Sequence, residues 1–102
     1  MSTFVDEIEQ AHAIDVKATE DSLAVDLDDG RTIIVPLGWY PRLWYGTPDE
    51  RSNVQIIGQG EYLHWPDLDE DLTISGLLAG RRSGESQRSL RQWLEAREQP
   101  RR

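Results

Sequence analysis

The chain is 102 residues long, has a formal net charge of −8, and contains no cysteine. Its length allows one domain with a single modest core, and its composition, 37% hydrophobic and 29% charged residues, excludes a disordered chain and a membrane protein. The lack of cysteine excludes disulfides, zinc-thiolate sites and thiol catalysis. Because the N-terminus has no basic region followed by an apolar run, we expect a cytoplasmic protein that does not bind a membrane.

The first third of the chain predicts a short helix followed by three strands. Thr3 opens a capping-box pattern, and apolar residues follow at helical spacing to about residue 12. Alternating apolar and β-branched residues predict the strands Ile14–Thr19, Leu23–Leu27 and Arg31–Val35. A polar turn joins the first two strands, and Asp28-Asp29-Gly30 is suited to a tight hairpin turn between the second and the third.

The middle of the chain predicts short helices and a second pair of strands. Pro36 ends the preceding strand because proline cannot donate to a β ladder, and a short helix with Pro41 in its first turn follows. A further helix is expected to begin with Thr47 as N-cap and Pro48 as its first residue. The remaining expected elements are strands over Val54–Ile57 and Glu61–Trp65 about a Gly58-Gln59-Gly60 turn, an acidic loop over Asp67–Asp71, and a helix containing Ile74, Leu77 and Leu78 that ends at Gly80.

The charge of the chain changes sign near residue 80. Residues 1–80 carry 16 acidic and 4 basic residues, whereas residues 81–102 carry 7 arginines and 3 acidic residues. We therefore divide the chain into an α+β domain, residues 1–80, and a basic linker with a C-terminal helix, residues 81–102. In that helix, expected from Ser86 to Gln99, Leu90, Trp93 and Leu94 share one face. The acidic body indicates a basic partner, although a solvated acidic surface is the simpler alternative.

These elements predict an α+β fold: a small antiparallel sheet built from β-hairpins, with short helices and a C-terminal amphipathic helix. The stretch from Val25 to Gly80 also resembles a small bacterial family known as domain of unknown function 2442. The resemblance implies a compact α+β domain whose gene often neighbours that of another small family, domain of unknown function 4160, in a toxin–antitoxin-like pair. It implies no catalytic residue. The strings that carry it are Asp29-Gly30-Arg31, Val35-Pro36-Leu37, Trp39-Tyr40-Pro41-Arg42-Leu43, Glu50-Arg51-Ser52-Asn53, His64-Trp65-Pro66 and Leu77-Leu78-Ala79-Gly80.

Aromatic and arginine side chains cluster in the middle of the chain, and these residue types are enriched at binding hot spots. A core this small cannot bury all of them, so we expect some to form a partner-binding surface. The alternative is that part of the set caps the sheet while the arginines brace the loops. The candidate partner-binding residues are Trp39, Tyr40, Arg42, Trp44, Arg51 and Trp65.

Catalytic and metal-binding patterns are weak in this sequence. His12 and His64 are far apart, and Asp67-x-Asp69-x-Asp71 lacks the glycine and the distal glutamate of an EF-hand loop. Ser52 and Ser75 lie in no Gly-x-Ser-x-Gly elbow. An enzyme would need a pocket in which His64, Asp67 and Arg42 converge. We therefore predict a protein that is not an enzyme and that uses no metal or cofactor.

The leading hypothesis is a protein-binding module, the antitoxin-like or regulatory member of a bacterial two-gene pair, whose partner is a small basic protein encoded by a neighbouring gene. The alternative is a nucleic-acid-associated transcriptional regulator that contacts phosphates through the basic C-terminal segment. The residues for that contact are Arg81, Arg82, Arg88 and Arg91. A third possibility for this segment, and the favoured one, is that its helix docks on the body of the same chain.

Overall fold

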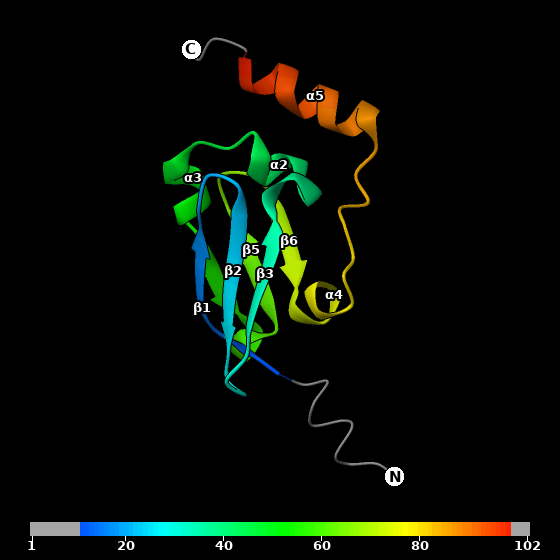
Figure 1. Cartoon of the computed structure of the whole chain (residues 1–102). Coiled ribbons are helices and arrows are strands. Elements are labelled where there is room, and N and C mark those ends of the chain that lie inside the picture. The colour runs from blue at the N-terminus through cyan, green and yellow to red at the C-terminus, as the bar shows by residue number, and fades with distance from the viewer. Residues whose placement is uncertain (1–10, 99–102) are drawn as a thin grey trace.

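Two antiparallel sheets of three strands each form the framework of the protein (Figure 1). The computed structural model describes residues 11–98. Each sheet is a meander, because its strands pair in the order in which they follow one another along the chain. The first contains β1 (Ala13–Ala18), β2 (Ser22–Leu27) and β3 (Thr32–Pro36), and the second contains β4 (Gln55–Ile57), β5 (Tyr62–Trp65) and β6 (Glu70–Thr73). The predicted α+β class is confirmed, with two sheets instead of one.

Short helices connect the two meanders and follow the second one. The 3-10 turns are η1 (Leu37–Trp39) and η2 (Gly58–Gly60), and the α-helices are α2 (Pro41–Trp44), α3 (Pro48–Ser52), α4 (Ile74–Leu78) and α5 (Gln87–Glu98). The expected starts of α2 and α3 are confirmed. In α3, Thr47 accepts a hydrogen bond from the Glu50 amide while the Glu50 carboxylate accepts one from the Thr47 amide, which satisfies two free N–H groups of the first turn.

The helix expected near the N-terminus falls mainly on residues 1–10, which lie outside the described residues. Ala11 and His12, where that prediction ended, have no regular secondary structure and lead directly into β1. Among residues 11–98, no helix is long and apolar enough to cross a membrane.

The hairpin of β2 and β3 forms as its turn chemistry predicts. Leu23 pairs with Val35 across the two strands, and Gly30 in the connecting turn has a φ of 95°. Leu23, Val25 and Leu27 alternate with less buried residues along β2 and face the interior. This period of two places one apolar face of the first sheet against the second sheet.

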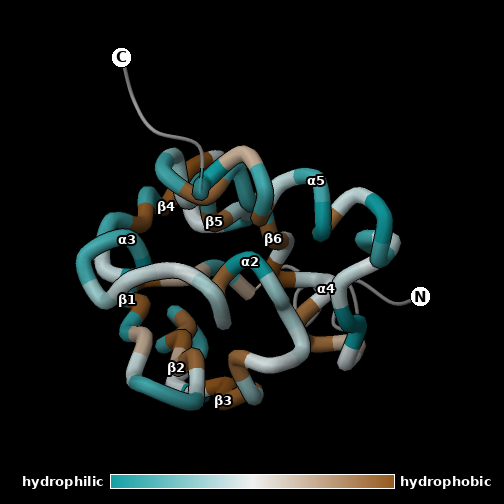
Figure 2. Tube along the Cα trace, turned by 90° about the horizontal axis from the view of Figure 1, so that it is seen from above, coloured by the Kyte–Doolittle hydropathy of each residue, from teal (hydrophilic) through white to brown (hydrophobic). Residues whose placement is uncertain are grey.

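The core lies between the two sheets, and short helices close its ends. Figure 2 looks down onto this arrangement, with β2 and β3 on one side, β4 to β6 on the other, and α2 over the space between them. The second sheet contributes Leu63 and Trp65, which are fully buried. Buried residues from η1, α2, the turn before β6 and α4 complete the core: Leu37, Tyr40, Leu43, Leu68, Ile74 and Leu77.

The predicted acidic loop over Asp67–Asp71 is wrong at its C-terminal end, because Glu70 and Asp71 belong to β6. Glu70 pairs with Trp65 and Leu72 pairs with Leu63, and paired residues project from the same face of an antiparallel sheet. Glu70 therefore faces inward beside the core. A third strand forms here despite its acidic sequence because its other face, with Asp71, points toward solvent.

Burial raises the pKa of the Glu70 carboxyl to about 7. The positive charge of Arg42 opposes this rise, while the negative charges of Glu85, Asp71 and Asp69 add to it. The side chain is thus placed where its charged form is disfavoured by loss of water contacts.

Gly60 occupies a position that no other residue fits without strain. Its φ is 94°, and a Cβ atom there would lie 2.7 Å from the carbonyl oxygen of Ala13 and 2.8 Å from the Cβ of His12. Positive φ favours glycine, and the contact brings the turn between β4 and β5 against the start of β1. Gly60 thereby fixes the approach of the two sheets at this end.

We expect Gly60→Ala to destabilise the protein by about 2 kcal/mol, since it combines an unfavourable backbone conformation with a clash against backbone atoms. The measurement is the denaturant midpoint. Gly38→Ala is the matched control, because a Cβ at Gly38 meets no atom within 4 Å and its φ is not in the positive range. Equal stability of the two variants would contradict the close approach.

Glu70→Gln should change how stability depends on pH. The folded-state pKa of Glu70, about 7, is above the ordinary 4.5, so its favourable contribution is complete below about pH 4.5 and is lost as pH rises through 7. We expect the variant to gain stability relative to wild type over this range, by about 1 kcal/mol after allowance for partial solvent exposure. Denaturation at pH 5 and pH 8 measures this gain, and Asp69→Asn, at an exposed neighbour, should show a smaller change.

Candidate partner-binding surface

The six residues predicted to bind a partner divide into buried and accessible ones. Trp65 is fully buried and Tyr40 is 2% exposed. The Trp65 indole donates to the Arg51 carbonyl oxygen at 2.9 Å, and the Tyr40 hydroxyl donates to the Arg81 carbonyl oxygen at 2.8 Å. Both polar groups are thus satisfied within the chain, so these two side chains hold the surface in place and are not direct contacts on it.

Arg51 braces the C-terminal end of α2. Its guanidinium donates to the carbonyl oxygens of Leu43 at 2.8 Å and Trp44 at 2.7 Å. Both carbonyls are at the C-terminal end of the helix, and the Leu43 oxygen also accepts from the Gly46 amide at 3.2 Å. Because Arg51 satisfies them, the position of Trp44 and Tyr45 is fixed relative to α3, and Arg51 acts mainly as a positioning residue.

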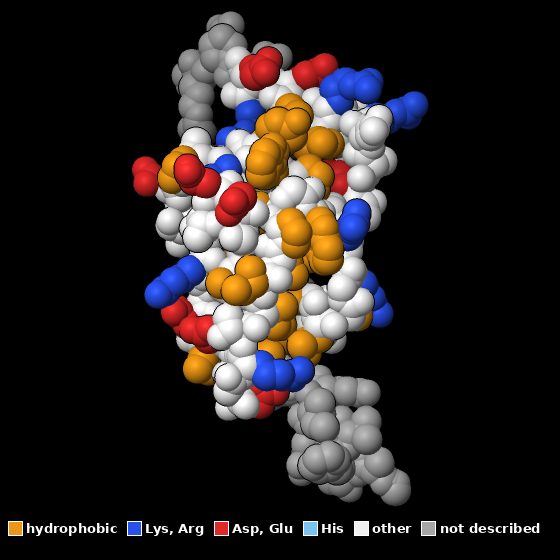
Figure 3. Space-filling model, in the orientation of Figure 1, with side chains coloured by type: hydrophobic (Ala, Val, Ile, Leu, Met, Phe, Trp, Pro, Cys, Tyr) orange, Lys and Arg blue, Asp and Glu red, His pale blue; other side chains and the backbone are white. Residues whose placement is uncertain are grey.

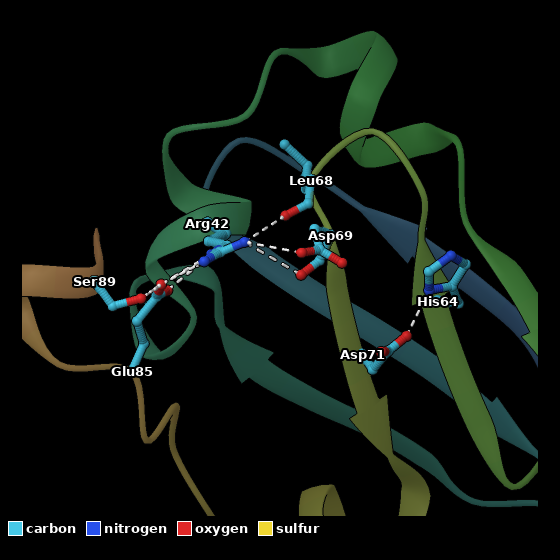
Figure 4. A network of polar contacts seen from close by, with 7 residues as sticks. All are labelled: Arg42, His64, Leu68, Asp69, Asp71, Glu85 and Ser89. Carbon is cyan, nitrogen blue, oxygen red and sulfur yellow. Dashed lines mark hydrogen bonds and ion pairs between the residues drawn. The ribbon is translucent and has the colours of Figure 1, made fainter. Parts of the chain in front are cut away.

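Arg42 lies at the centre of a polar network (Figure 4). Its guanidinium pairs with Glu85 at 2.6 Å and donates to the Leu68 carbonyl oxygen at 3.3 Å. Ser89 of α5 also donates to Glu85, at 2.7 Å. The hydrogen bonds from Arg42 hold the pKa of Glu85 below its usual range. Arg42 therefore links the turn before β6 to the segment that leads into α5.

The C-terminal helix α5 docks on the body, as the third possibility for this segment anticipated. The guanidinium carbons of Arg42 and Arg97 lie 5.0 Å and 4.6 Å from the centroid of the Trp93 ring, which is within cation–π range. Arg97 also pairs with Glu50 of α3 at 2.8 Å, and this pair lowers the pKa of Glu50. The part of the body that carries Arg42 and Glu50 thus binds a basic helix of the same chain.

Glu50 and Glu85 were not among the predicted site residues, although they supply both ion pairs of this docking. Glu50 had a local signal as the third residue of a capping box, which does not reveal its partner 47 residues later. Glu85 had no signal beyond its isolated position among basic and small residues. Both become visible only when the chain is folded.

Trp44 and Tyr45 remain accessible after α5 has docked. They are 46% and 51% exposed and directly precede α3, whose first turn carries Asp49 and Glu50. Trp39 is half-buried, with the Arg82 guanidinium 4.8 Å from the centroid of its ring. We call Trp44, Tyr45 and Asp49, which lie within six positions of one another in the chain, the aromatic–acidic patch.

Other exposed apolar side chains are distributed over the two sheets. Figure 3 shows hydrophobic side chains along the middle of the face that carries the first sheet. The apolar residues that are at least 40% exposed are Ile14 and Ile34 on the first sheet and Ile56, Ile57 and Tyr62 on the second. Single exposed apolar residues are normal on protein surfaces, so they carry less weight than an aromatic pair beside acids.

The arginines proposed for nucleic acid lie on the linker and on α5. Arg88 and Arg91 are exposed on α5, and Arg81 and Arg82 are exposed in the linker. Within residues 11–98, no acidic side chain lies within ion-pair distance of these four arginines. Docking of α5 therefore leaves Arg88 and Arg91 accessible, on the part of the helix that does not contact the body.

A pocket of about 500 Å³ lies between β6, α4 and the linker. Its lining includes Tyr40, Arg42, Glu70, Arg81 and Glu85. The pocket does not contain the constellation that an enzyme hypothesis required. Arg42 lines the pocket and pairs with Glu85, whereas His64 pairs with Asp71 and Asp67 accepts from Asn53, and neither His64 nor Asp67 is in the lining (Figure 4).

Within the described part of the chain, no group of three or more His, Cys, Asp or Glu side chains is arranged to hold a metal ion. Asp67, Asp69 and Asp71, whose spacing has some likeness to a calcium loop, have separate roles: Asp67 accepts from Asn53, Asp69 lies 3.7 Å from Arg42, and Asp71 pairs with His64.

Comparison with known proteins gives the family of the chain. Residues 13–83 match the family model described as protein of unknown function (DUF2442). A crystal structure of a protein of unknown function from Rhodospirillum rubrum is 32% identical, with a TM-score of 0.67, over 74% of this chain and 94% of that chain.

An NMR structure of an uncharacterized protein from Chromobacterium violaceum has a TM-score of 0.65 at 20% identity, over 92% of this chain and 83% of that chain. Because 92% of the chain is more than residues 1–83 alone, the matched part includes residues of the C-terminal segment. No curated protein matches the chain. The chain belongs to the DUF2442 family of proteins of unknown function.

Proposed function

We propose that this protein is a non-enzymatic binding module for a small basic protein, the antitoxin-like or regulatory member of a bacterial two-gene pair. The observation that carries the proposal is the aromatic–acidic patch, in which Trp44 and Tyr45 stay about half exposed and the acidic first turn of α3 follows them closely in the chain. Aromatic anchors beside acidic groups suit a partner with cationic and apolar side chains.

The charge of the body supports a basic partner. Residues 1–80 carry 16 acids against 4 basic residues. Among residues 11–98, no lysine or arginine lies within ion-pair distance of Asp15, Glu20, Asp21 or Asp26. The negative field of these carboxylates speeds association with a cationic protein. The affinity itself comes from Trp44 and Tyr45, which become buried when the partner binds.

The direct test is affinity purification of the tagged full chain from its native cells at low and moderate salt. The proposal expects one small basic protein, encoded next to this gene, that stays bound at moderate salt. Recovery of no such protein under either condition argues against the proposed function.

Trp44→Ala should weaken the complex with that protein by about 2 kcal/mol, roughly a thirtyfold loss of affinity, because a hot-spot tryptophan loses its contact area. Fold stability should stay within about 0.5 kcal/mol of wild type, since the side chain is accessible. Titration calorimetry with the purified partner measures the loss. The control is Ile34→Ala, which truncates a side chain that is 67% exposed on the first sheet. If Ile34→Ala weakens binding as much as Trp44→Ala, the contact surface is not the aromatic–acidic patch.

A nucleic-acid-binding function is the second candidate, and the observation that favours it is the accessible pair Arg88 and Arg91 on one helix. Positions three apart lie on the same side of a helix. Two such arginines, joined by Arg81 and Arg82 in the linker, form a basic strip to which phosphates can bind.

On this candidate, affinity for duplex DNA falls steeply with salt, and the double variant Arg88→Gln/Arg91→Gln lowers the slope of log affinity against log salt by about 2. Fluorescence anisotropy between about 50 and 200 mM salt measures the slope. Arg31→Gln is the control, because Arg31 pairs with Asp29 at the β2–β3 turn and should leave the slope unchanged. Lack of binding at the lowest salt rejects this candidate.

A further inference from the structure

The helix α5 is attached to the body through a small contact. Its apolar residues Leu90, Trp93 and Leu94 are only partly buried, and no residue of the helix is buried. The polar contacts are those of Glu85 and Arg97 with Arg42 and Glu50. Partly buried contacts of this kind open at a low free-energy cost compared with the core.

The linker before α5 is held at two places, at its start and by the ion pair of Glu85 with Arg42. Gly80 follows α4 and has a φ of 74°, and residues 81–86 have no regular secondary structure. The Ser83 amide donates to the Trp39 carbonyl oxygen at 3.0 Å, and Tyr40 donates to Arg81. Beyond Ser83 come Gly84 and the Glu85 ion pair, so α5 can leave the body while residues up to Ser83 stay in place.

The domain is complete without α5. The buried core residues among the described part of the chain end at Leu77, and the family match ends at residue 83. In the Rhodospirillum rubrum protein, 94% of the chain corresponds to 74% of this one, a share close to that of residues 13–83. The surface beneath α5 is therefore formed by residues of the part of the chain that the family match covers.

The docked helix shows which chemistry this surface accepts. Trp93 stacks against Arg42, and Arg97, one helical turn later, pairs with Glu50. Positions four apart lie on one side of a helix, so the surface fits an amphipathic helix with an aromatic residue followed by arginine at the fourth position. Glu50 supplies the charge complementarity that selects a basic helix.

We propose that the surface formed by Arg42 and Glu50 is a docking site for an amphipathic, arginine-bearing helix of the basic partner, and that α5 occupies this site as an internal competitor. The inference rests on the proposed function and adds its mode of recognition. The occupant is a helix of another protein, because a second copy of this chain brings a net charge of −8 against an acidic body.

An internal competitor lowers the apparent affinity of the site. A helix tethered by a short linker acts at an effective concentration in the millimolar range, so a partner helix must bind more tightly than α5 or encounter the site when α5 is released. Loss of α5 docking should therefore raise the affinity for a helix added in trans by the inverse of the fraction of wild-type molecules in which the site is free.

The test uses the full chain and a fluorescently labelled peptide with the sequence of residues 86–98. We expect Trp93→Ala, which removes the aromatic contact of α5, to bind the peptide at least about tenfold more tightly than wild type. Arg97→Gln is a second release variant, and thermal melts confirm that both are folded. The same peptide with alanine in place of its tryptophan should not bind.

Glu50→Gln in the Trp93→Ala chain should cancel the gain, because glutamine retains the capping box but loses the ion pair with the peptide arginine. Asp15→Asn is the matched control, since it removes an exposed charge on the first sheet that does not contact Arg97. Equally weak peptide binding by wild type and both release variants overturns the inference, as does a dimer of the release variants in light scattering. Capture of a basic protein from cells equally by wild type and Trp93→Ala keeps the proposed function but overturns this docking site.

Discussion

The indole of Trp65 connects the core to the surface, and the arrangement of the aromatic–arginine segment depends on it. The ring is fully buried between the two sheets, and its N–H group donates to the Arg51 carbonyl oxygen. The Arg51 side chain in turn donates to the carbonyl oxygens of Leu43 and Trp44. A buried donor must be paired to avoid a penalty of a few kcal/mol, so α3 is held against β5 and α2 against α3. This chain of contacts leaves Trp44 exposed at a fixed place.

The acceptors that the fold places near each arginine decide which arginine contacts α5 and which one only holds the body together. Arg42 and Arg51 belong to one short segment. Arg51 donates to carbonyl oxygens at the C-terminal end of α2, whereas Arg42 contacts Glu85 and the Trp93 ring. A guanidinium can do either, because its planar fork bonds carbonyl oxygens and carboxylates and also stacks on aromatic rings. Its role is decided by which acceptors the fold places within reach.

Much of the fold could be predicted from the sequence because its signals are local. The Asp28-Asp29-Gly30 turn, Pro41 and the Thr47–Glu50 capping box each specify an element through neighbouring residues. The strand β6 was missed because its signal is not local: Glu70 faces inward only through its pairing with Trp65, and consecutive acids are typical of loops. The candidate surface was partly predictable for the same reason. Aromatic and arginine enrichment indicated the segment, but the burial of Tyr40 and the pairing of Glu50 with Arg97 depend on contacts more than 40 residues apart in the chain.

The opposite charges of body and tail gain a physical meaning in the folded chain. Docking of α5 neutralises Glu50 and Arg97 against each other but leaves Arg88 and Arg91 facing solvent. The Arg97 and Glu50 side chains are only 27% and 23% exposed, so this pair adds to the attraction that the stacked Trp93 and its partly buried neighbours supply. Such an interface depends on shape and on the aromatic ring more than on net charge. Salt therefore weakens the long-range attraction between the acidic body and cationic molecules more than it weakens the docking of α5.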